Sequence, residues 1–409
     1  MSNKYGFLNG FLRNDTLHDI ELYSGSGDKL IDKNNKKYVD LNSGLWNVSL
    51  GYNHELNENI KKSFSDILDN NLPYIDMTSY SHKLYDEVSQ KLIDFMKTPD
   101  LNKVIFTNSG SESIEAALKI MHTIGNKNYI ASFSNSYHGT FYGDMSISGL
   151  TKPLNTKKNV DYKNTILFDF PENHSDEIEL FKNIEKYSEK INALFIEPVI
   201  GSGGIYFRST EFYNKLIKLC NDLDIFVVFD EVATGFYKTG NRFFINKLDV
   251  APDIICLSKA INNGTLPAGA LILKESLSNS LENTTIKHMS TQNGNLLVMS
   301  SIYETLNYYI KYDNSLLNNV NLIMQKTKEI CLENNVNGRI IGSMIAIPVN
   351  KKDIEPLVKL LKMSGIIVYR HITKNGSGLT LYPNINIDIK VYEKTLKYIM
   401  KKVNKYEYS

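Results

Sequence analysis

Two apolar runs of the chain each end on a residue whose charge does not suit an apolar setting. They are Phe226-Val-Val-Phe-Asp-Glu-Val232 and Pro252-Asp-Ile-Ile-Cys-Leu-Ser-Lys-Ala260. Runs this apolar predict strands covered on both faces of a sheet. Asp230 and Lys259 then stand at two strand ends. Because open α/β sheets bind ligands beyond the carboxyl ends of their strands, both side chains are candidates for a binding site.

Further short apolar runs alternate with segments of helical period around these two. We expect strands at residues 103–106, 129–133, 193–196, 225–229, 254–257 and 270–273, and helices at 112–124 and 211–221. This alternation predicts an α/β domain over residues 56–295. After Leu296 a long helical stretch precedes strand-like runs at 339–348, 365–369 and 378–382. That change predicts a smaller α+β domain over residues 296–409, to which residues 1–55 contribute.

Composition excludes several classes of function. The chain has 409 residues, a hydrophobic share of 42%, a charged share of 22% and a formal charge of +1. A charge this small favours neither nucleic acid nor an anionic membrane as partner. No apolar stretch is long enough to cross a bilayer, and the first residues lack a secretory pattern, so we expect a cytoplasmic protein. The three scattered cysteines, Cys220, Cys256 and Cys331, predict buried thiols and no metal site.

A third motif, Thr107-Asn-Ser-Gly-Ser-Glu-Ser113, joins an expected strand to an expected helix. Backbone N–H groups and hydroxyls at a helix start form an anion site. Each of the three features also has a plainer interpretation. The turn can be an ordinary helix cap. Asp230 can pair with a structural cation, and Lys259 can extend its amine to the surface.

Together and in this order, these features resemble the class III (ω-type) aminotransferases of pyridoxal-phosphate (PLP) fold type I. The resemblance extends over nearly the whole chain. The matching segments are Gly27-Asp-Lys-Leu-Ile-Asp-Lys33, Tyr38-Val-Asp-Leu-Asn-Ser-Gly-Leu-Trp46, Asn108-Ser-Gly-Ser-Glu112, Tyr137-His-Gly139, Glu197-Pro-Val-Ile-Gly-Ser-Gly-Gly204, Asp230-Glu-Val-Ala-Thr-Gly-Phe236, Ser258-Lys-Ala260 and Thr291-Gln-Asn-Gly-Asn295. The resemblance implies a large domain with a mixed, mostly parallel sheet and PLP as cofactor.

The resemblance also implies catalytic and cofactor-binding roles. Lys259 would carry PLP as a Schiff base and then move a proton, and Asp230 would hold the pyridinium nitrogen. The other residues expected around the cofactor are Gly110 and Ser111 at the phosphate, Tyr137 and Val232 on the two ring faces, and His138 in a structural or ring-orienting role. Thr291 would reach the phosphate of the neighbouring subunit, which implies a homodimer.

The substrate side departs from the family pattern. Trp46 and Glu197 are expected near the substrate, Glu197 as a polar gate. Ala233 replaces a common glutamine. Thr380 stands where the family usually has an arginine that clamps an α-carboxylate, and a hydroxyl cannot replace that bidentate fork. Either Arg370 or His371 takes over this role, or one substrate lacks an α-carboxylate.

We therefore expect an aminotransferase that moves an amino group from a donor to a ketone or aldehyde. The acceptor would lack an α-carboxylate, as in a peptide or natural-product precursor. Aminomutase, racemase or epimerase and decarboxylase chemistry on the same fold remain alternatives, as does a non-catalytic PLP-binding protein. A nucleotide-binding α/β protein is disfavoured because the chain lacks both a P-loop and a Gly-x-Gly-x-x-Gly motif.

Overall fold

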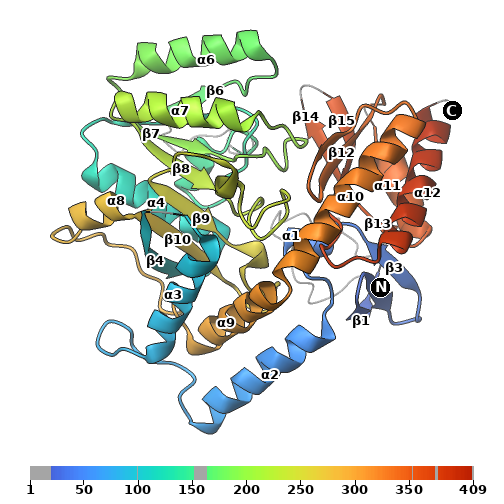
Figure 1. Ribbon diagram of the computed structural model, residues 1–409, viewed down its shortest axis with the longest axis horizontal. Coiled ribbons are helices and arrows are strands. Elements are labelled where there is room, and N and C mark those ends of the chain that lie inside the picture. Colours follow the sequence, from blue (N-terminus) through green and yellow to red (C-terminus); the bar gives the residue numbers. More distant parts are fainter. Residues whose placement is uncertain (1–19, 99, 152–163, 352, 374–375, 408–409) are drawn as a thin grey trace, which may run out of the picture.

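The computed structural model describes residues 20–98, 100–151, 164–351, 353–373 and 376–407 (Figure 1). Its centre is a seven-stranded sheet in the order β4-β10-β9-β8-β7-β5-β6. The strands are β4 (Leu101–Thr107), β5 (Tyr129–Phe133), β6 (Thr165–Phe168), β7 (Ile191–Ile196), β8 (Phe226–Asp230), β9 (Ile254–Leu257) and β10 (Gly269–Lys274). β10 is antiparallel to both neighbours, and β6, β5, β7, β8 and β9 pair in parallel. The predicted mixed, mostly parallel sheet is confirmed.

Helices cover both faces of this sheet, as the apolar runs predicted. They are α3 (Lys83–Met96), α4 (Gly110–Ile124), α6 (His174–Tyr187), α7 (Thr210–Asp222), α8 (Glu275–Ser280) and α9 (Leu296–Lys311). Alternate residues of a strand point to opposite faces. Accordingly, Val227 and Phe229 pack in the cluster that contains α3, α7 and α9, whereas Val228 packs in the cluster that contains α4.

The six strands expected in this region are all present, with ends within two residues of their expected places. β6 was not expected from the sequence. Its run, Thr165-Ile-Leu-Phe168, has four residues at the edge of the sheet. A run this short has too little periodicity to separate it from a loop.

A second group of elements lies beside the central sheet, at the right of Figure 1. The helices α10 (Asp313–Glu333), α11 (Glu355–Met363) and α12 (Ile389–Glu407) pack with the sheet β11-β12-β15-β14. Its strands are β11 (Arg339–Ile341), β12 (Met344–Val349), β14 (Tyr369–Thr373) and β15 (Gly376–Leu381). The expected single run at 339–348 is a hairpin, because Gly342 turns the chain at a φ of 57°.

The beginning of the described chain joins this second group. β1 (Leu22–Ser26), β2 (Lys29–Asp32) and β3 (Lys37–Asp40) form a sheet with β13 (Ile366–Ile367), to which β3 is parallel. The short α1 (Ser43–Trp46) follows, and α2 (His54–Asp69) packs against α9. The contribution of residues 1–55 to a smaller domain stays a prediction. Domain limits at residues 55 and 295 stay predictions.

Other expectations concern single residues and the ends of the chain. Cys220, Cys256 and Cys331 are buried and unpaired, as predicted. Within the described ranges, no helix combines the length and apolarity that a membrane span requires. The first residues, from which we expected no secretory signal, lie outside the described part of the chain.

Candidate active site

A cavity of about 180 Å³ lies at the carboxyl ends of the parallel strands. Its walls come from segments that are far apart in sequence. The lining residues are Trp46, Ser109, Gly110, Ser111, Tyr137, His138, Gly139, Glu197, Asp230, Val232, Ala233, Ser258 and Lys259. The structure thus brings together nine of the predicted site residues, all except Thr291 and Arg370.

Lys259 lies two residues beyond the end of β9, after Ser258, and opens the short 3-10 helix η3 (Lys259–Asn262). Its φ is 48°, a left-handed conformation that is strained for a lysine and is typical of functional positions. Its Nζ lies 4.0 Å from the centre of a Trp46 ring. Burial lowers the pKa of Lys259 to about 8, against the opposing effects of Asp230 and Glu197. A substantial fraction of this amine is therefore neutral and nucleophilic near neutral pH.

Asp230 ends β8 and is only 3% exposed. His138 Nδ1 lies 2.8 Å from Asp230 Oδ2, and the Val232 N–H donates to Oδ1 over 3.0 Å. The His138 ring is buried, and its Nε2 has no partner in the described chain. An imidazole ring that carries a proton on Nδ1 satisfies this geometry. Two donors therefore fix the Asp230 carboxylate at the cavity wall.

Glu197 stands just beyond β7 and is buried. Its carboxylate accepts the N–H groups of Tyr137, over 2.7 Å, and of Gly201, over 3.2 Å. Burial raises the pKa of Glu197 to about 7, which His138 opposes and Asp230 reinforces. Burial therefore favours the protonated form of Glu197, which lines the same cavity as Lys259.

The start of α4 forms an anion cradle at the cavity. Ser109 caps the helix, since its hydroxyl accepts the Glu112 N–H over 3.1 Å. A Cβ on Gly110 would lie 2.8 Å from Val232 Cγ1, so this position requires glycine. The helix N-terminus at Gly110 and Ser111 attracts negative charge. This cradle, the Asp230 carboxylate and the Lys259 amine fit the phosphate, ring nitrogen and aldehyde of PLP.

Two predicted site residues lie away from the cavity lining. The Arg370 guanidinium pairs with the Glu355 carboxylate and is partly exposed. Thr291 is exposed in the segment that precedes α9. Neither placement within one chain tests the role expected of these residues, and both roles stay predictions.

Several lining residues were not singled out from the sequence. Ser109, Gly139 and Ser258 border the cavity. All three lie within or beside the motifs quoted from the sequence, so those motifs could have indicated them as lining residues. Tyr382, whose ring centre lies 4.0 Å from that of Trp46, supports the cavity wall from behind. Nothing in the local sequence indicated that long-range contact.

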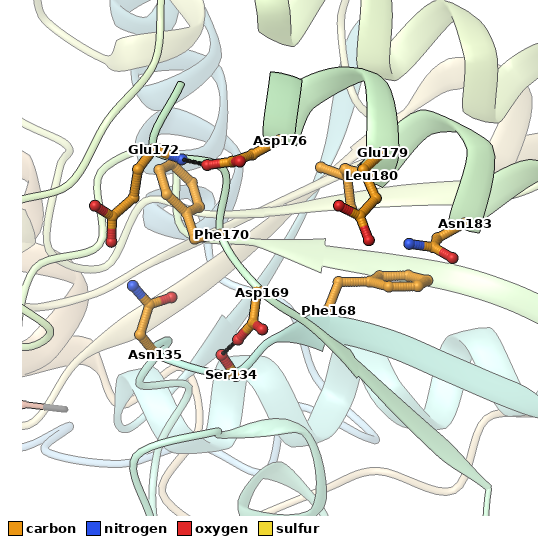
Figure 2. Close-up of a pocket in the computed structure, with 10 residues that line it drawn as sticks. All are labelled: Ser134, Asn135, Phe168, Asp169, Phe170, Glu172, Asp176, Glu179, Leu180 and Asn183. Atoms are coloured by element: carbon orange, nitrogen blue, oxygen red, sulfur yellow. Dashed lines mark hydrogen bonds between the residues drawn. The ribbon is translucent and has the colours of Figure 1, made fainter. Parts of the chain in front are cut away.

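A second cavity, of about 390 Å³, is shown in Figure 2. Asp169, Glu172 and Glu179 surround it with carboxylates, and Phe168 and Phe170 form its apolar side. The cavity has no amine or imidazole in its lining. Among the described residues it therefore offers no amine that could bind an aldehyde, and we place the chemistry in the smaller cavity with Lys259.

Comparisons with known proteins agree with this geometry. The family model described as aminotransferase class-III matches residues 13–399. The chain is 29% identical over 393 residues to an acetylornithine aminotransferase of Bacillus cereus, covering 94% of each protein. It is 30% identical over 311 residues to an adenosylmethionine-8-amino-7-oxononanoate aminotransferase of Helicobacter pylori, covering 71% of this chain and 69% of the relative.

Solved structures share the fold. A transaminase from the marine bacterium Virgibacillus has a TM-score of 0.85 and 25% identity, over 95% of this chain and 93% of that structure. A Bacillus anthracis aminotransferase has a TM-score of 0.83 and 25% identity, over 96% and 95%. Because the family model spans almost the entire chain, this protein belongs to the class III aminotransferases, is a transaminase of PLP fold type I, and uses PLP as its cofactor.

Proposed function

We propose that the cavity at the carboxyl ends of β8 and β9 binds PLP and exchanges an amino group between a donor and a ketone or aldehyde. In this proposal Lys259 binds the cofactor aldehyde, Asp230 binds the ring nitrogen, and Gly110 and Ser111 bind the phosphate. One observation carries it. A lysine amine, a fixed carboxylate and a helix N-terminus line a single cavity.

When bound, PLP would supply an electron sink for the negative charge that develops at the substrate Cα. The neutral Nζ of Lys259 would take the proton from this Cα and would later serve as the acid that returns a proton. Asp230 holds a proton on the ring nitrogen, and His138 keeps the Asp230 carboxylate in place through its Nδ1–H. Trp46 and Tyr137 supply apolar walls that exclude water from the reacting atoms.

We further propose that the acceptor lacks an α-carboxylate. The Thr380 hydroxyl is engaged with His371 Nδ1 at 2.9 Å, and Arg339 Nη2 donates to His371 Nε2 over 3.3 Å. Burial and the Arg339 charge lower the pKa of His371 to about 4, so this imidazole is neutral at pH 7. Arg370 pairs with Glu355. Because these side chains are already paired or neutral, they support an acceptor with no carboxylate beside its carbonyl group, as on a peptide or natural-product precursor.

The acceptor proposal has a direct test. Rates are compared for matched pairs of an aldehyde and the 2-oxo acid with the same side chain. We expect a higher kcat/KM for the aldehyde in each pair. Consistently faster reaction of the 2-oxo acids would contradict this part of the proposal. It would leave the cofactor assignments unaffected.

We also propose a homodimer in which Thr291 completes the phosphate site of the partner. Its support is the exposure of apolar side chains in and against the segment that contains Thr291. Met289 is 67% exposed, and Met77, whose Cε would lie 3.1 Å from a Cβ on Gly294, is 41% exposed. Patches of this kind mark interfaces between proteins. Mixing inactive Lys259→Ala and Thr291→Glu subunits should restore activity, because one site of each hybrid is intact. No recovery in hybrids whose formation is verified would refute shared sites.

The central test is the visible absorption spectrum of the purified protein and of Lys259→Ala, before and after adding amines and amino acids. We expect a yellow band that bleaches with certain donors in the natural protein only. Net amino exchange between two different compounds separates transfer from racemase or aminomutase chemistry. A protein that takes up no added PLP would refute the proposal.

A cytoplasmic location stays a prediction, supported by the unpaired thiols.

A further inference from the structure

A buried acid beside the cavity has no role in the mechanism above. Asp144 begins the short helix α5 (Asp144–Ile147) and is 0% exposed. Neither of its carboxylate oxygens has a partner in hydrogen-bond geometry within the described chain. An ionised carboxylate in such a place would carry a large desolvation cost. The neutral acid, which is a hydrogen-bond donor, suits this site better.

Asp144 lies directly behind the phosphate cradle. A Cβ built on Gly139 would be 2.1 Å from Asp144 Oδ2 and 2.5 Å from Ser111 Oγ. The carboxyl group and the hydroxyl therefore meet over the same glycine, which lines the cavity together with Ser111. Gly139 has a φ of 123°, so both the space and the backbone at this point require glycine.

The Ser111 hydroxyl already has one donor directed at it, the Thr140 N–H at 3.3 Å. A hydroxyl oxygen accepts up to two hydrogen bonds and donates one. If the neutral Asp144 carboxyl donates to the same oxygen, both acceptor positions are filled. The Ser111 O–H is then available to donate to another acceptor, such as a phosphate bound at the N-terminus of α4.

The charged groups around Asp144 favour its neutral form. Burial raises the pKa of Asp144 to about 8, the Glu115 and Asp230 charges add to this, and contacts with Ser111 and the Phe141 N–H oppose it. Glu115 comes from α4, and its Oε1 accepts the Gly143 N–H over 2.9 Å. Tyr137 is the nearby phenol, and its pKa is raised to about 12. β5 and β6, which also pack against α5, contain no charged residue.

We propose that Asp144 is a positioning residue for the cofactor phosphate, which in its protonated form donates to Ser111 Oγ and turns the Ser111 O–H toward the phosphate. This inference rests on the proposed function, because it assumes that α4 holds the phosphate. Loss of the Asp144 proton has two effects. The Ser111 O–H turns back to the carboxylate, and a negative charge appears beside the phosphate dianion. Both effects weaken phosphate binding as the pH rises through the pKa of Asp144.

The test measures the dissociation constant of pyridoxamine 5′-phosphate from pH 7 to 9.5, by its own fluorescence. This probe has no aldehyde, so Lys259 forms no bond to it, and its phosphate is a dianion throughout the range. In the natural protein we expect affinity to fall by up to about tenfold per pH unit above the pKa of Asp144. Asp144→Asn, which keeps a donor and cannot ionise, should match the natural protein at pH 7 and lack this fall.

Two controls isolate the effect. Titration of Lys259 and Glu197 is common to both proteins and cancels in the comparison. Pyridoxamine without the phosphate should bind both proteins with the same pH profile. Asp144→Ala, which loses the donor as well as the charge, should bind the phosphorylated probe about two- to tenfold more weakly than Asp144→Asn at pH 7. Circular dichroism and thermal unfolding verify that each variant is folded.

Parallel pH profiles for the natural protein and Asp144→Asn would overturn the inference. The inference would also be overturned if the pH profiles of the natural protein and Asp144→Asn differed in the same way for pyridoxamine without the phosphate. If the natural protein binds pyridoxamine 5′-phosphate at no pH, the proposed function itself fails. That outcome is distinct from binding that is merely insensitive to Asp144.

Discussion

Two regions of the molecule differ in how their charged groups are used. The cofactor wall, at the ends of β8 and β9, presents the Asp230 carboxylate and the Lys259 amine to the active-site cavity. The acceptor region, formed by β14 and β15, contributes none of the described residues that line this cavity. There Arg370 is paired with Glu355, and a neutral His371 is bound to Thr380, which stands where the family usually has an arginine. Experiments on the two regions should consequently give different kinds of effect.

The largest effect is expected at Lys259. Replacement by alanine removes the base, so turnover should fall by at least about 10²–10⁴-fold, because a positioned acid–base group contributes that much. Steady-state kinetics of amino transfer measure this loss. Lys274, at the end of β10, is a matched strand-end lysine outside the cavity lining. Lys274→Ala should leave turnover unchanged, and an equal loss in both variants would place the base elsewhere.

The rate at which the protein captures PLP should also depend on pH through Lys259. Its pKa of about 8 lies below the ordinary value of 10.5, and only the neutral amine attacks the aldehyde. Stopped-flow absorbance should therefore show the capture rate rising from pH 7 and levelling off above pH 8 to 9. A rate that falls over this range would contradict the assignment.

Asp230 and Glu231 are adjacent acids, and their replacement should affect catalysis and stability differently. Asp230→Asn should lower kcat by about 10²–10³-fold with little change in thermal stability, since it removes an electrostatic contact with the ring nitrogen. Glu231 instead accepts the N–H groups of Phe244 and Ile245, over 2.9 Å each, and is 0% exposed. Glu231→Gln should destabilise the fold by about 1–3 kcal/mol. The reverse pattern, measured by kinetics and denaturation, would exchange the two roles.

The acceptor region should affect stability through His371. Its pKa is about 4 in the fold and 6.5 when unfolded, so the unfolded chain binds the proton first as the pH falls. The resulting stability is present above pH 6.5 and is lost progressively down to about pH 4, by up to about 3 kcal/mol. Urea unfolding of His371→Gln should show a smaller loss over this window. An unchanged pH slope would mean that His371 is not buried as a neutral group.

The smallest effect is expected at Arg370. With its guanidinium on Glu355, Arg370→Ala should change KM for a 2-oxo acid by less than about twofold. Steady-state kinetics with 2-oxoglutarate provide the measurement. Glu355→Gln is the matched control, because it releases the guanidinium from its partner. A KM that rises tenfold or more in Arg370→Ala would show that Arg370 leaves Glu355 to clamp the substrate.

Local pattern accounts for the part of the molecule that was predictable. An apolar run such as Phe226–Asp230 specifies a buried strand through a few neighbouring residues. The sequence therefore predicted these strands correctly. The order of the motifs then indicated the site residues, and nine of the predicted site residues line one cavity. Strand β6 and the hairpin at Gly342 were not foreseen, because short edge strands and single turn residues carry little periodic signal.

The sequence by itself determined the sheet, its family and the chemical types at the cofactor wall. Only the tertiary structure decided which partner each polar group has. It pairs Arg370 with Glu355 and joins His371 to Arg339, and it leaves the Asp144 carboxylate behind Ser111 without a hydrogen-bond partner among the described residues. The physical reason is that burial and hydrogen bonding depend on residues distant in the chain. Those contacts set the charge of a side chain, which its identity alone does not.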